Sequence, residues 1–169
     1  GGLGFVLGVV NGLSSTLSRL LDSTLQMIRN IPHLALIPLV ILWFGIGEQG
    51  KLFLVAEGVL FPVYVNTYHG IRNVDSGLLE MGQVYGLSRW EVFRDIVLPG
   101  ALPSILVGVR YALGVMWLTL IVAETIAASS GIGYITMQAR EFMQTDVLVM
   151  GILLYAALGK LADTVARLL

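Results

Sequence analysis

Residues 80–99 have the sequence EMGQVYGLSRWEVFRDIVLP and form the longest polar interruption in an otherwise apolar chain. The spacing predicts two short helices joined at Gly86, because glycine readily adopts the left-handed conformation that ends a helix. Pro99 is expected to end the second helix, since proline has no N–H to donate and disfavours helical backbone in Leu98. The stretch is therefore predicted to be a helical loop between two apolar segments.

Side chains at the start of each predicted helix can stabilise this loop. Asp75 or Ser76 can accept a hydrogen bond from an early backbone N–H of the first helix. Ser88 can do the same for the second helix, and Glu91 three residues later completes the pattern of a capping box. We expect an apolar face along the two helices, formed by Leu78, Leu79, Gly82, Tyr85, Trp90 and Phe93.

The composition is that of a membrane protein. Hydrophobic residues make up 56% of the 169 residues, charged residues make up 12%, and the mean hydropathy is +0.84. A soluble domain carries about 25% charged residues. The predicted fold class is an all-α, polytopic membrane helical bundle. The chain has no cysteine, so no disulfide is expected. The net charge of −1 is uninformative about partners, but the chain has no basic run, and no nucleic-acid partner is expected.

Five apolar segments are predicted to cross the membrane. They cover about residues 1–21, 34–44, 52–68, 101–123 and 148–161. Within and between them we expect a kink at Pro38, turns at 45–50 and 127–134, and a short polar helix at 137–145. Because the chain begins at Gly1 inside an apolar segment, we expect that a first membrane helix is missing from it.

Gly4, Gly8 and Gly12 are spaced four residues apart and form two overlapping G-x-x-x-G patterns. Glycines on one helix face allow another helix to approach closely in lipid. The pattern suits either packing within the subunit or a dimer contact, and we favour packing within the subunit.

The positions of Lys and Arg predict the orientation of the chain. If residues 80–99 are cytoplasmic and the spans alternate, only Lys51 and Arg140 lie on the outer side. The C-terminus is then inside. The cations on or near the cytoplasmic side are Arg19, Arg29, Arg72, Arg89, Arg94, Arg110, Lys160 and Arg167.

The sequence offers no pattern for an enzyme or a cofactor. It contains no G-x-x-x-x-G-K-[ST] phosphate loop, so ATP binding by that route is not expected. His33 and His69 lie far apart and lack a second ligand at helical spacing. No metal, cofactor or catalytic residue is therefore predicted.

Residues 80–99 resemble the cytoplasmic signature loop of binding-protein-dependent ABC importer permeases. That pattern is Glu-Ala-Ala, three residues, Gly, nine residues, Ile, one residue and Leu-Pro. Met81 and Gly82 stand at the two alanine places, which is a mild departure. The matching positions are Glu80, Gly86, Ile96, Leu98 and Pro99.

Further segments resemble permeases for aliphatic sulfonates, taurine and nitrate, and the likeness is strongest to the aliphatic-sulfonate branch. These segments are residues 32–48, 61–71, 98–110, 122–134 and 142–146. The resemblance implies the type I ABC importer permease fold and a single transmembrane permease domain over residues 1–169, with a coupling loop at about 73–99. The implied function is ATP-driven import, with aliphatic sulfonates as the expected solute. Taurine, nitrate or another small anion or nutrient is the alternative.

The resemblance also implies partners. They are two ATP-binding cassette subunits, a periplasmic or lipid-anchored substrate-binding protein, and a second permease subunit, expected to be an identical copy, within the lipid bilayer of the bacterial inner membrane. The coupling loop would dock on the ATP-binding subunit. In it, Glu80 would orient the loop, Gly86 would allow the turn, and Trp90 would pack either on the partner or within its own subunit. Arg89 would pair with acidic partner residues or enforce the inside orientation. Ile96, Leu98 and Pro99 complete the loop residues.

Polar or aromatic residues in or beside the spans are candidates for the solute path or its gate. They are Asn66, Trp117, Thr119, Glu124, Ser129 and Ser130. Helix–helix packing or hydrogen bonding is the alternative for each. Glu124 is the preferred gate residue, by itself or paired with Arg140 or another cation, because a carboxylate is a poor main contact for a sulfonate anion. Glu57 also lies within a span, where a carboxyl is costly unless it faces protein or water.

A stand-alone channel or secondary carrier is the alternative of a different class. A channel has no need of the glycine-jointed loop at residues 80–99, and carriers usually have more charges at mid-membrane than Glu57 and Glu124. A membrane enzyme is disfavoured, because no nucleophile–base pair is visible. The loop therefore favours the importer subunit.

Overall fold

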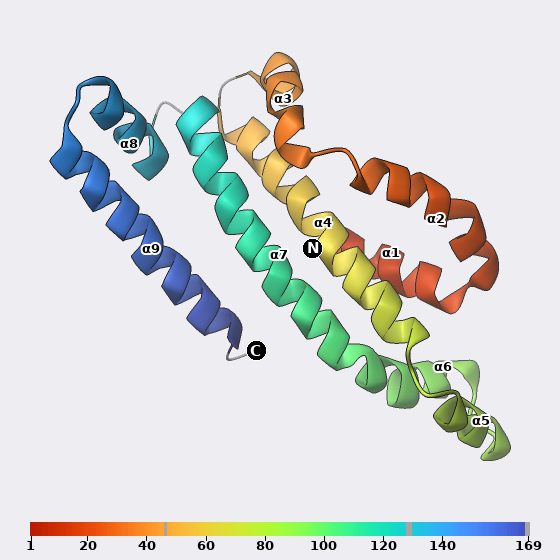
Figure 1. The fold of residues 1–169 in the computed structure, drawn as a ribbon. Helices are drawn as coiled ribbons and strands as arrows, with labels where there is room; N and C mark the ends of the chain where they lie inside the picture. The colour runs from red at the N-terminus through yellow and green to blue at the C-terminus, as the bar shows by residue number, and fades with distance from the viewer. Residues whose placement is uncertain (46, 128–129, 168–169) are drawn as a thin grey trace. The chain divides into compact units, whose positions relative to one another are not determined.

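The computed structural model describes residues 1–45, 47–127 and 130–167 and is helical throughout, with short connections and no strand in these ranges (Figure 1). The predicted all-α fold class is confirmed. The α-helices are α1 (Gly2–Leu13), α2 (Ser15–Arg29), α3 (Ile37–Phe44), α4 (Glu48–Arg72), α5 (Ser76–Val84), α6 (Arg89–Val92), α7 (Leu98–Ala127), α8 (Ile132–Glu141) and α9 (Thr145–Arg167). A 3-10 turn, His33–Leu36, precedes α3, and a π turn, Phe93–Val97, joins α6 to α7.

The chain forms two compact units. One unit contains Gly1–Asn30 and Leu60–Tyr111, and the other contains Ile31–Val59 and Ala112–Leu169. Helices α4 and α7 each contribute one end to each unit.

Two described helical stretches are long and apolar enough to cross a membrane, judged by length and composition. They are Arg89–Glu124 and Thr145–Ala166. Gly2–Leu13 and Leu34–Phe44 are apolar but shorter. The fourth and fifth expected spans therefore lie in suitable helices, and the total of five spans stays a prediction.

The first expected span, residues 1–21, is broken at Ser14. The backbone there is extended, with φ −112° and ψ 110°, and α2 starts at the next residue. The Ser14 carbonyl accepts from the Ser18 N–H at 3.0 Å, so this serine opens a new helix. Serine is a favoured residue at that position because it competes with helical backbone bonds and caps helix starts.

The sequence predicts a kink at Pro38, but the structure has no kinked helix there. It lies in the first turn of α3, where the missing N–H would have no helical partner in any case. The turn expected at 45–50 is shorter in the structure. Gly45 does turn the chain, with φ 71°, but α4 begins at Glu48, so Gly50 is already helical.

Pro99 does not end the helix that precedes it, which corrects a second expectation about proline. The chain is helical from Arg89 to Glu124, and Pro99 lies in the first turn of α7. Directly before it, the Leu98 N–H bonds to the Phe93 carbonyl five residues back, as in a π turn. In an α-helix the proline ring would clash with the carbonyl four residues back. The wider π turn shifts the backbone carbonyls just before Pro99, so the helix continues past the proline.

The C-terminal helices also begin earlier than expected. Helix α8 covers Ile132–Glu141 rather than 137–145, and α9 covers Thr145–Arg167 rather than 148–161. Gly131, with φ 112°, opens α8 and so shortens the expected turn at 127–134, in which residues 128 and 129 lie outside the described chain.

The three N-terminal glycines pack against α4 within the subunit, as we favoured. Gly4 lies against the Leu60 carbonyl. A Cβ atom at Gly8 would be 2.6 Å from the Thr67 Cβ, and one at Gly12 would be 3.0 Å from the Ile71 Cβ. The glycine face of α1 is therefore already used by the chain's own α4.

Helices α4 and α7 use the same device where they pack together in the first unit. A Cβ atom at Gly70 would lie 3.0 Å from the Ala101 carbonyl, and one at Gly108 would lie 3.1 Å from the Pro62 carbonyl. The Ser104 hydroxyl donates to the Asn66 carbonyl at 2.9 Å. Beside this contact lies a buried apolar cluster of Ile71, Val97, Ala101 and Ile105.

The second unit has its own apolar cluster. Ile37 and Val40 of α3 meet Leu54 of α4 and Ala123 of α7, and all four are buried. Helices α8 and α9 pack as a hairpin, with Gly151 directly against Thr136.

The glycine contacts lead to a stability prediction with a matched control. Gly8→Leu should lower the thermal unfolding temperature of the detergent-solubilised protein, because α1 must move away from α4 to admit the side chain. Overpacking of this kind typically costs about 1–3 kcal/mol. Gly114→Leu, at a helical glycine with no atom near its Cβ position, should leave the unfolding temperature unchanged or slightly raised. Equal losses in both variants would contradict the packing role of Gly8.

Candidate functional site

The loop that precedes α7 starts with a side-chain cap. The Asp75 carboxylate accepts a hydrogen bond from the Gly77 N–H at 2.8 Å, so Asp75 rather than Ser76 caps α5. This bond satisfies one of the backbone donors that a helix start leaves unpaired.

Gly86 ends α5 in the left-handed conformation that the sequence predicts, with φ 74°. The Leu87 N–H bonds to the Gly82 carbonyl and the Gly86 N–H bonds to the Gln83 carbonyl, both at 3.0 Å. These two bonds form a Schellman motif. No atom approaches the Cβ position of Gly86, so the requirement for glycine there comes from the backbone angle and not from crowding.

Ser88 and Glu91 form the predicted capping box at the start of α6. The Glu91 N–H donates to the Ser88 hydroxyl at 3.3 Å, and the Ser88 N–H donates to the Glu91 carboxylate at 2.7 Å. The two short helices are thus fixed at both sides of Gly86 by local hydrogen bonds.

The loop has an inner face that packs on the start of α7. Leu79, Val92 and Phe93 contact the buried cluster around Ala101. A Cβ atom at Gly82 would lie 2.8 Å from the Ile96 Cδ1 atom. Glycine at the second alanine place of the family pattern therefore lets α5 lie close to the π turn.

The loop also has an outer face, which we define as Leu78, Met81, Val84, Tyr85 and Trp90. Leu78, Tyr85 and Trp90 were expected on the same face as Leu79, Gly82 and Phe93, but they point outward. The exposed fractions of Val84, Tyr85 and Trp90 are 85%, 77% and 66%. The Trp90 ring leans on Phe93, with ring centres 5.6 Å apart.

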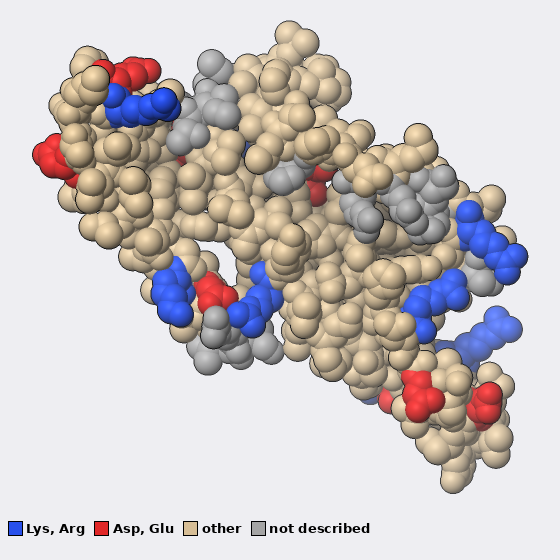
Figure 2. Space-filling model, in the orientation of Figure 1, with Lys and Arg blue, Asp and Glu red and all other residues tan. Residues whose placement is uncertain are grey.

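Charged side chains accompany the outer face, and Figure 2 shows acidic groups among uncharged residues at the end of the unit where α5 and α6 lie. Glu80 and Arg89 are exposed, and neither forms an ion pair within the described part of the chain. Ile96 and Leu98 are half-buried and Pro99 is exposed. Exposed apolar patches rimmed by polar residues mark sites of interaction with a protein or a membrane.

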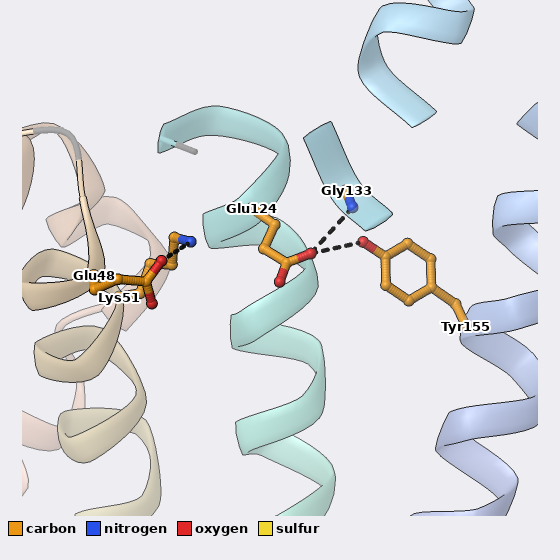
Figure 3. Close-up of polar contacts among 5 residues, drawn as sticks. All are labelled: Glu48, Lys51, Glu124, Gly133 and Tyr155. Atoms are coloured by element: carbon orange, nitrogen blue, oxygen red, sulfur yellow. Dashed lines mark hydrogen bonds and ion pairs between the residues drawn. The ribbon is translucent and has the colours of Figure 1, made fainter. Parts of the chain in front are cut away.

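A second polar arrangement lies in the other unit, around Glu124 near the end of α7 (Figure 3). One carboxylate oxygen of Glu124 accepts from the Gly133 N–H at 3.1 Å and from the Tyr155 hydroxyl at 3.4 Å. The ring of Trp117 meets Tyr155 edge-on, with centres 6.2 Å apart. Three helices, α7, α8 and α9, therefore meet at this carboxylate.

The expected pairing of Glu124 with Arg140 is not found. Arg140 is exposed on α8 and forms no ion pair with Glu124 in the described ranges. Lys51, drawn in Figure 3, pairs with Glu48 at 2.7 Å.

The other candidates for the solute path have differing surroundings. Asn66 donates its side-chain N–H to the Pro62 carbonyl at 2.9 Å and lies at the contact of α4 with α7. Trp117 packs on Gly159 of α9, and Thr119 is buried. Ser130 is exposed, and Ser129 lies outside the described residues.

Sequence reasoning missed Tyr155 and Gly133. Tyr155 is the only tyrosine within residues 148–161 and could have been noticed as a donor in an apolar span. The glycines at 131 and 133 were predicted only as part of the turn at 127–134, and no spacing rule connects either of them to Glu124.

Comparison with known proteins places these features in a family. The sequence profile described as "Binding-protein-dependent transport system inner membrane component" matches residues 1–169. A putative aliphatic sulfonates transport permease protein of Escherichia coli (strain K12) is 70% identical over 151 residues, which are 89% of this chain and 57% of the relative.

Two further relatives show lower identity. A putative aliphatic sulfonates transport permease protein of Bacillus subtilis (strain 168) is 48% identical over 99% of this chain and 61% of its own length. A taurine transport system permease protein of Escherichia coli (strain K12) is 40% identical over 98% of this chain and 60% of its own length. The chain thus spans about three fifths of the length of these relatives.

The loop pattern at Glu80, Gly86, Ile96, Leu98 and Pro99 lies inside the matched region, and the described structure is helical as a permease of this kind requires. The chain belongs to the family of binding-protein-dependent transport system inner membrane components.

Proposed function

We propose that this chain is part of the membrane-spanning subunit of an ATP-driven importer for aliphatic sulfonates. The observation that carries the proposal is the 70% identity to a relative named for aliphatic sulfonates transport, against 40% to one named for taurine transport. Taurine, itself a small sulfonate, is the second candidate solute. Residues 1–169 act as one permease domain, with the coupling loop at about 73–99.

The proposed setting is the bacterial inner membrane, which the chain crosses several times with the coupling loop on the cytoplasmic side. Two ATP-binding cassette subunits hydrolyse ATP, a periplasmic or lipid-anchored binding protein delivers the solute, and a second copy of the permease completes the pathway. The excess of Lys and Arg on the loop's side of the predicted spans supports this orientation.

The coupling loop transmits movement in this proposal because one face contacts the ATP-binding subunit and the other packs on α7. The outer face, with Trp90 66% exposed, docks in a cleft on the ATP-binding subunit. The inner face and the π turn join the loop to α7 as one continuous helical body. A rigid-body displacement of the docked loop therefore moves the base of α7. Glu80 and Arg89 supply the charges that orient the contact.

The solute path is proposed to involve residues near the α7–α8 connection. Ser130 is exposed there and Ser129 adjoins it in sequence. Asn66 and Trp117 make helix–helix contacts, which supports the packing alternative for both. Glu124, the preferred gate residue from the sequence, lies near this connection, and its hydrogen bonds to α8 and α9 support the packing alternative for it as well.

Reconstitution tests the proposed function. The full complex in liposomes should take up an alkanesulfonate when ATP, the ATP-binding subunit and the binding protein are all supplied. Uptake without ATP or without the other subunits would favour a channel or carrier instead. Uptake of taurine in strong preference to longer alkanesulfonates would favour the second candidate solute.

Gly86→Val should uncouple ATP hydrolysis from uptake while the subunit remains in the membrane. A β-branched residue in the left-handed conformation costs about 1–2 kcal/mol, and the Schellman motif would be lost. Gly86→Asn is the matched control, because asparagine tolerates that backbone conformation. We expect at least a ten-fold fall in solute moved per ATP for Gly86→Val and less than a two-fold fall for Gly86→Asn. Normal coupling in Gly86→Val would contradict the docking role of the loop.

Trp90→Ala should weaken co-purification of the ATP-binding subunit with the permease. Loss of a large aromatic side chain at the centre of an interface costs about 2 kcal/mol or more, so at least a ten-fold loss of retained partner is expected. Trp43→Ala is the control, since Trp43 is 63% exposed on α3, away from the loop in sequence. Equal retention in the two variants would remove Trp90 from the contact.

A further inference from the structure

Helices α8 and α9 form a hairpin whose closed end is made by residues 142–144. The Gln144 N–H bonds to the Ala139 carbonyl at 2.8 Å, and Met143 has φ 56°. Gly133, Thr136 and Ala139 are buried along α8. The two helices are held at this end by the backbone, and farther along by the contact of Thr136 with Gly151.

Glu124 lies at the opposite, open end of the hairpin. The same carboxylate oxygen accepts from the Gly133 N–H, at the start of α8, and from the Tyr155 hydroxyl, well along α9. Figure 3 shows both donors directed at this oxygen from the same side. One atom of α7 therefore joins the two arms of the hairpin where no backbone connection does.

The start of α8 depends on this carboxylate. Gly131 precedes the helix and offers no side chain to cap it. A carboxylate near a helix start is favourable because the first N–H groups carry partial positive charge. Gly131 also has φ 112°, and a Cβ atom there would lie 2.8 Å from the Glu124 carboxylate. The absence of a side chain at residue 131 is what lets the carboxylate reach Gly133.

The second donor is held in place by aromatic packing. Trp117 lies two turns before Glu124 on α7 and meets the Tyr155 ring at 81°. Trp117 is in turn close to Gly159, where a Cβ atom would lie 3.0 Å from the indole nitrogen. The Tyr155 hydroxyl is therefore directed to Glu124 by contacts that involve no charge.

We propose that Glu124 is a positioning residue that holds the open end of the α8–α9 hairpin closed throughout transport, and that it does not contact the solute. The proposal rests on the proposed function only for its transport readout. The carboxylate acts through α8 and Tyr155, and the hairpin is the part of the chain whose position it determines.

The chain has no cysteine, so a single introduced thiol reports on the hairpin. Thr136→Cys places a thiol of nearly the same size at a buried position of α8. Its rate of reaction with a polar maleimide measures how often α8 separates from α9. In this background, Glu124→Ala should raise the rate at least ten-fold, and Tyr155→Phe should raise it about three-fold.

Two comparisons separate positioning from solute contact. Glu124→Gln keeps a carbonyl oxygen that can accept both hydrogen bonds, so its labelling rate should stay within about three-fold of the parent. Adding Tyr155→Phe to Glu124→Ala should raise the rate no further, because both changes remove the same contact. Labelling that is unchanged in Glu124→Ala would overturn the proposal.

A disulfide supplies the decisive test. The Cβ atoms at residues 136 and 151 would lie 3.6 Å apart, which is within the range that a disulfide requires. Thr136→Cys with Gly151→Cys should cross-link on oxidation, and Thr136→Cys removes the methyl group that crowds residue 151. The oxidised pair should restore transport in Glu124→Ala to at least half that of the oxidised pair with Glu124 intact. The reduced pair should not.

Failure of the oxidised pair to restore transport would overturn the proposal and favour direct contact of Glu124 with solute. Transport blocked by the disulfide with Glu124 intact would also overturn it, because the hairpin would then have to open. If the complex with Glu124 intact moves no sulfonate, the proposed function fails, and the labelling rates, which need no solute, still decide the role of Glu124.

Discussion

The close approach of helix backbones at glycine is the interaction on which the first unit depends. In lipid there is little hydrophobic drive for helices to associate, because the tails are as apolar as the side chains. Contacts must then come from packing at short range. Gly8 and Gly12 bring α1 onto α4, and Gly70 and Gly108 bring α4 onto α7. Helix α4 is held from two sides by partners that would separate if larger residues replaced these glycines.

Some polar side chains at these contacts form hydrogen bonds from one helix to the next. Asn11 donates its side-chain N–H to the Tyr64 hydroxyl at 2.6 Å, and Ser104 donates to the Asn66 carbonyl. Such bonds fix which residues face one another, whereas glycine fixes how close they come. The two together give α1, α4 and α7 a defined register in the first unit.

The coupling loop and the Glu124 contact both provide acceptors for the backbone N–H groups at a helix start, but from different places in the chain. Every helix start leaves backbone N–H groups without partners. In the loop, Asp75 and Ser88 satisfy them from neighbouring residues. At α8, the acceptor is Glu124, nine residues before Gly133 in the sequence and on another helix. A locally capped helix keeps its shape when it moves, whereas a helix capped by its neighbour is also held at a fixed place.

This difference explains what the sequence could predict. The caps at Asp75 and Ser88 and the left-handed Gly86 were predicted correctly, because each depends on residues within five positions of one another. The effects of Pro38 and Pro99 were predicted wrongly, because whether proline ends a helix depends on the turn before it. The early start of α8 was also missed, because the acceptor at the start of that helix is Glu124 on another helix.

The site around Glu124 shows most clearly which contacts cannot be predicted from the sequence. Glu124 was recognised from its charge in an apolar setting, and Trp117 as an aromatic residue within a span. Tyr155 and Gly133 were missed, because their role follows only from three helices meeting. No residue spacing records that a hydroxyl 31 positions away is directed to this carboxylate.

The π turn at Phe93–Val97 has a consequence for the direction in which the coupling loop faces. A π turn contains one residue more than the equivalent α-helical turn, and one residue corresponds to a rotation of about 100° around a helix axis. The direction in which α6 faces around the axis of α7 therefore depends on the one extra residue in this turn. Deleting one residue there would keep both helices but turn Trp90 by about a quarter of a circle, away from the side it now faces.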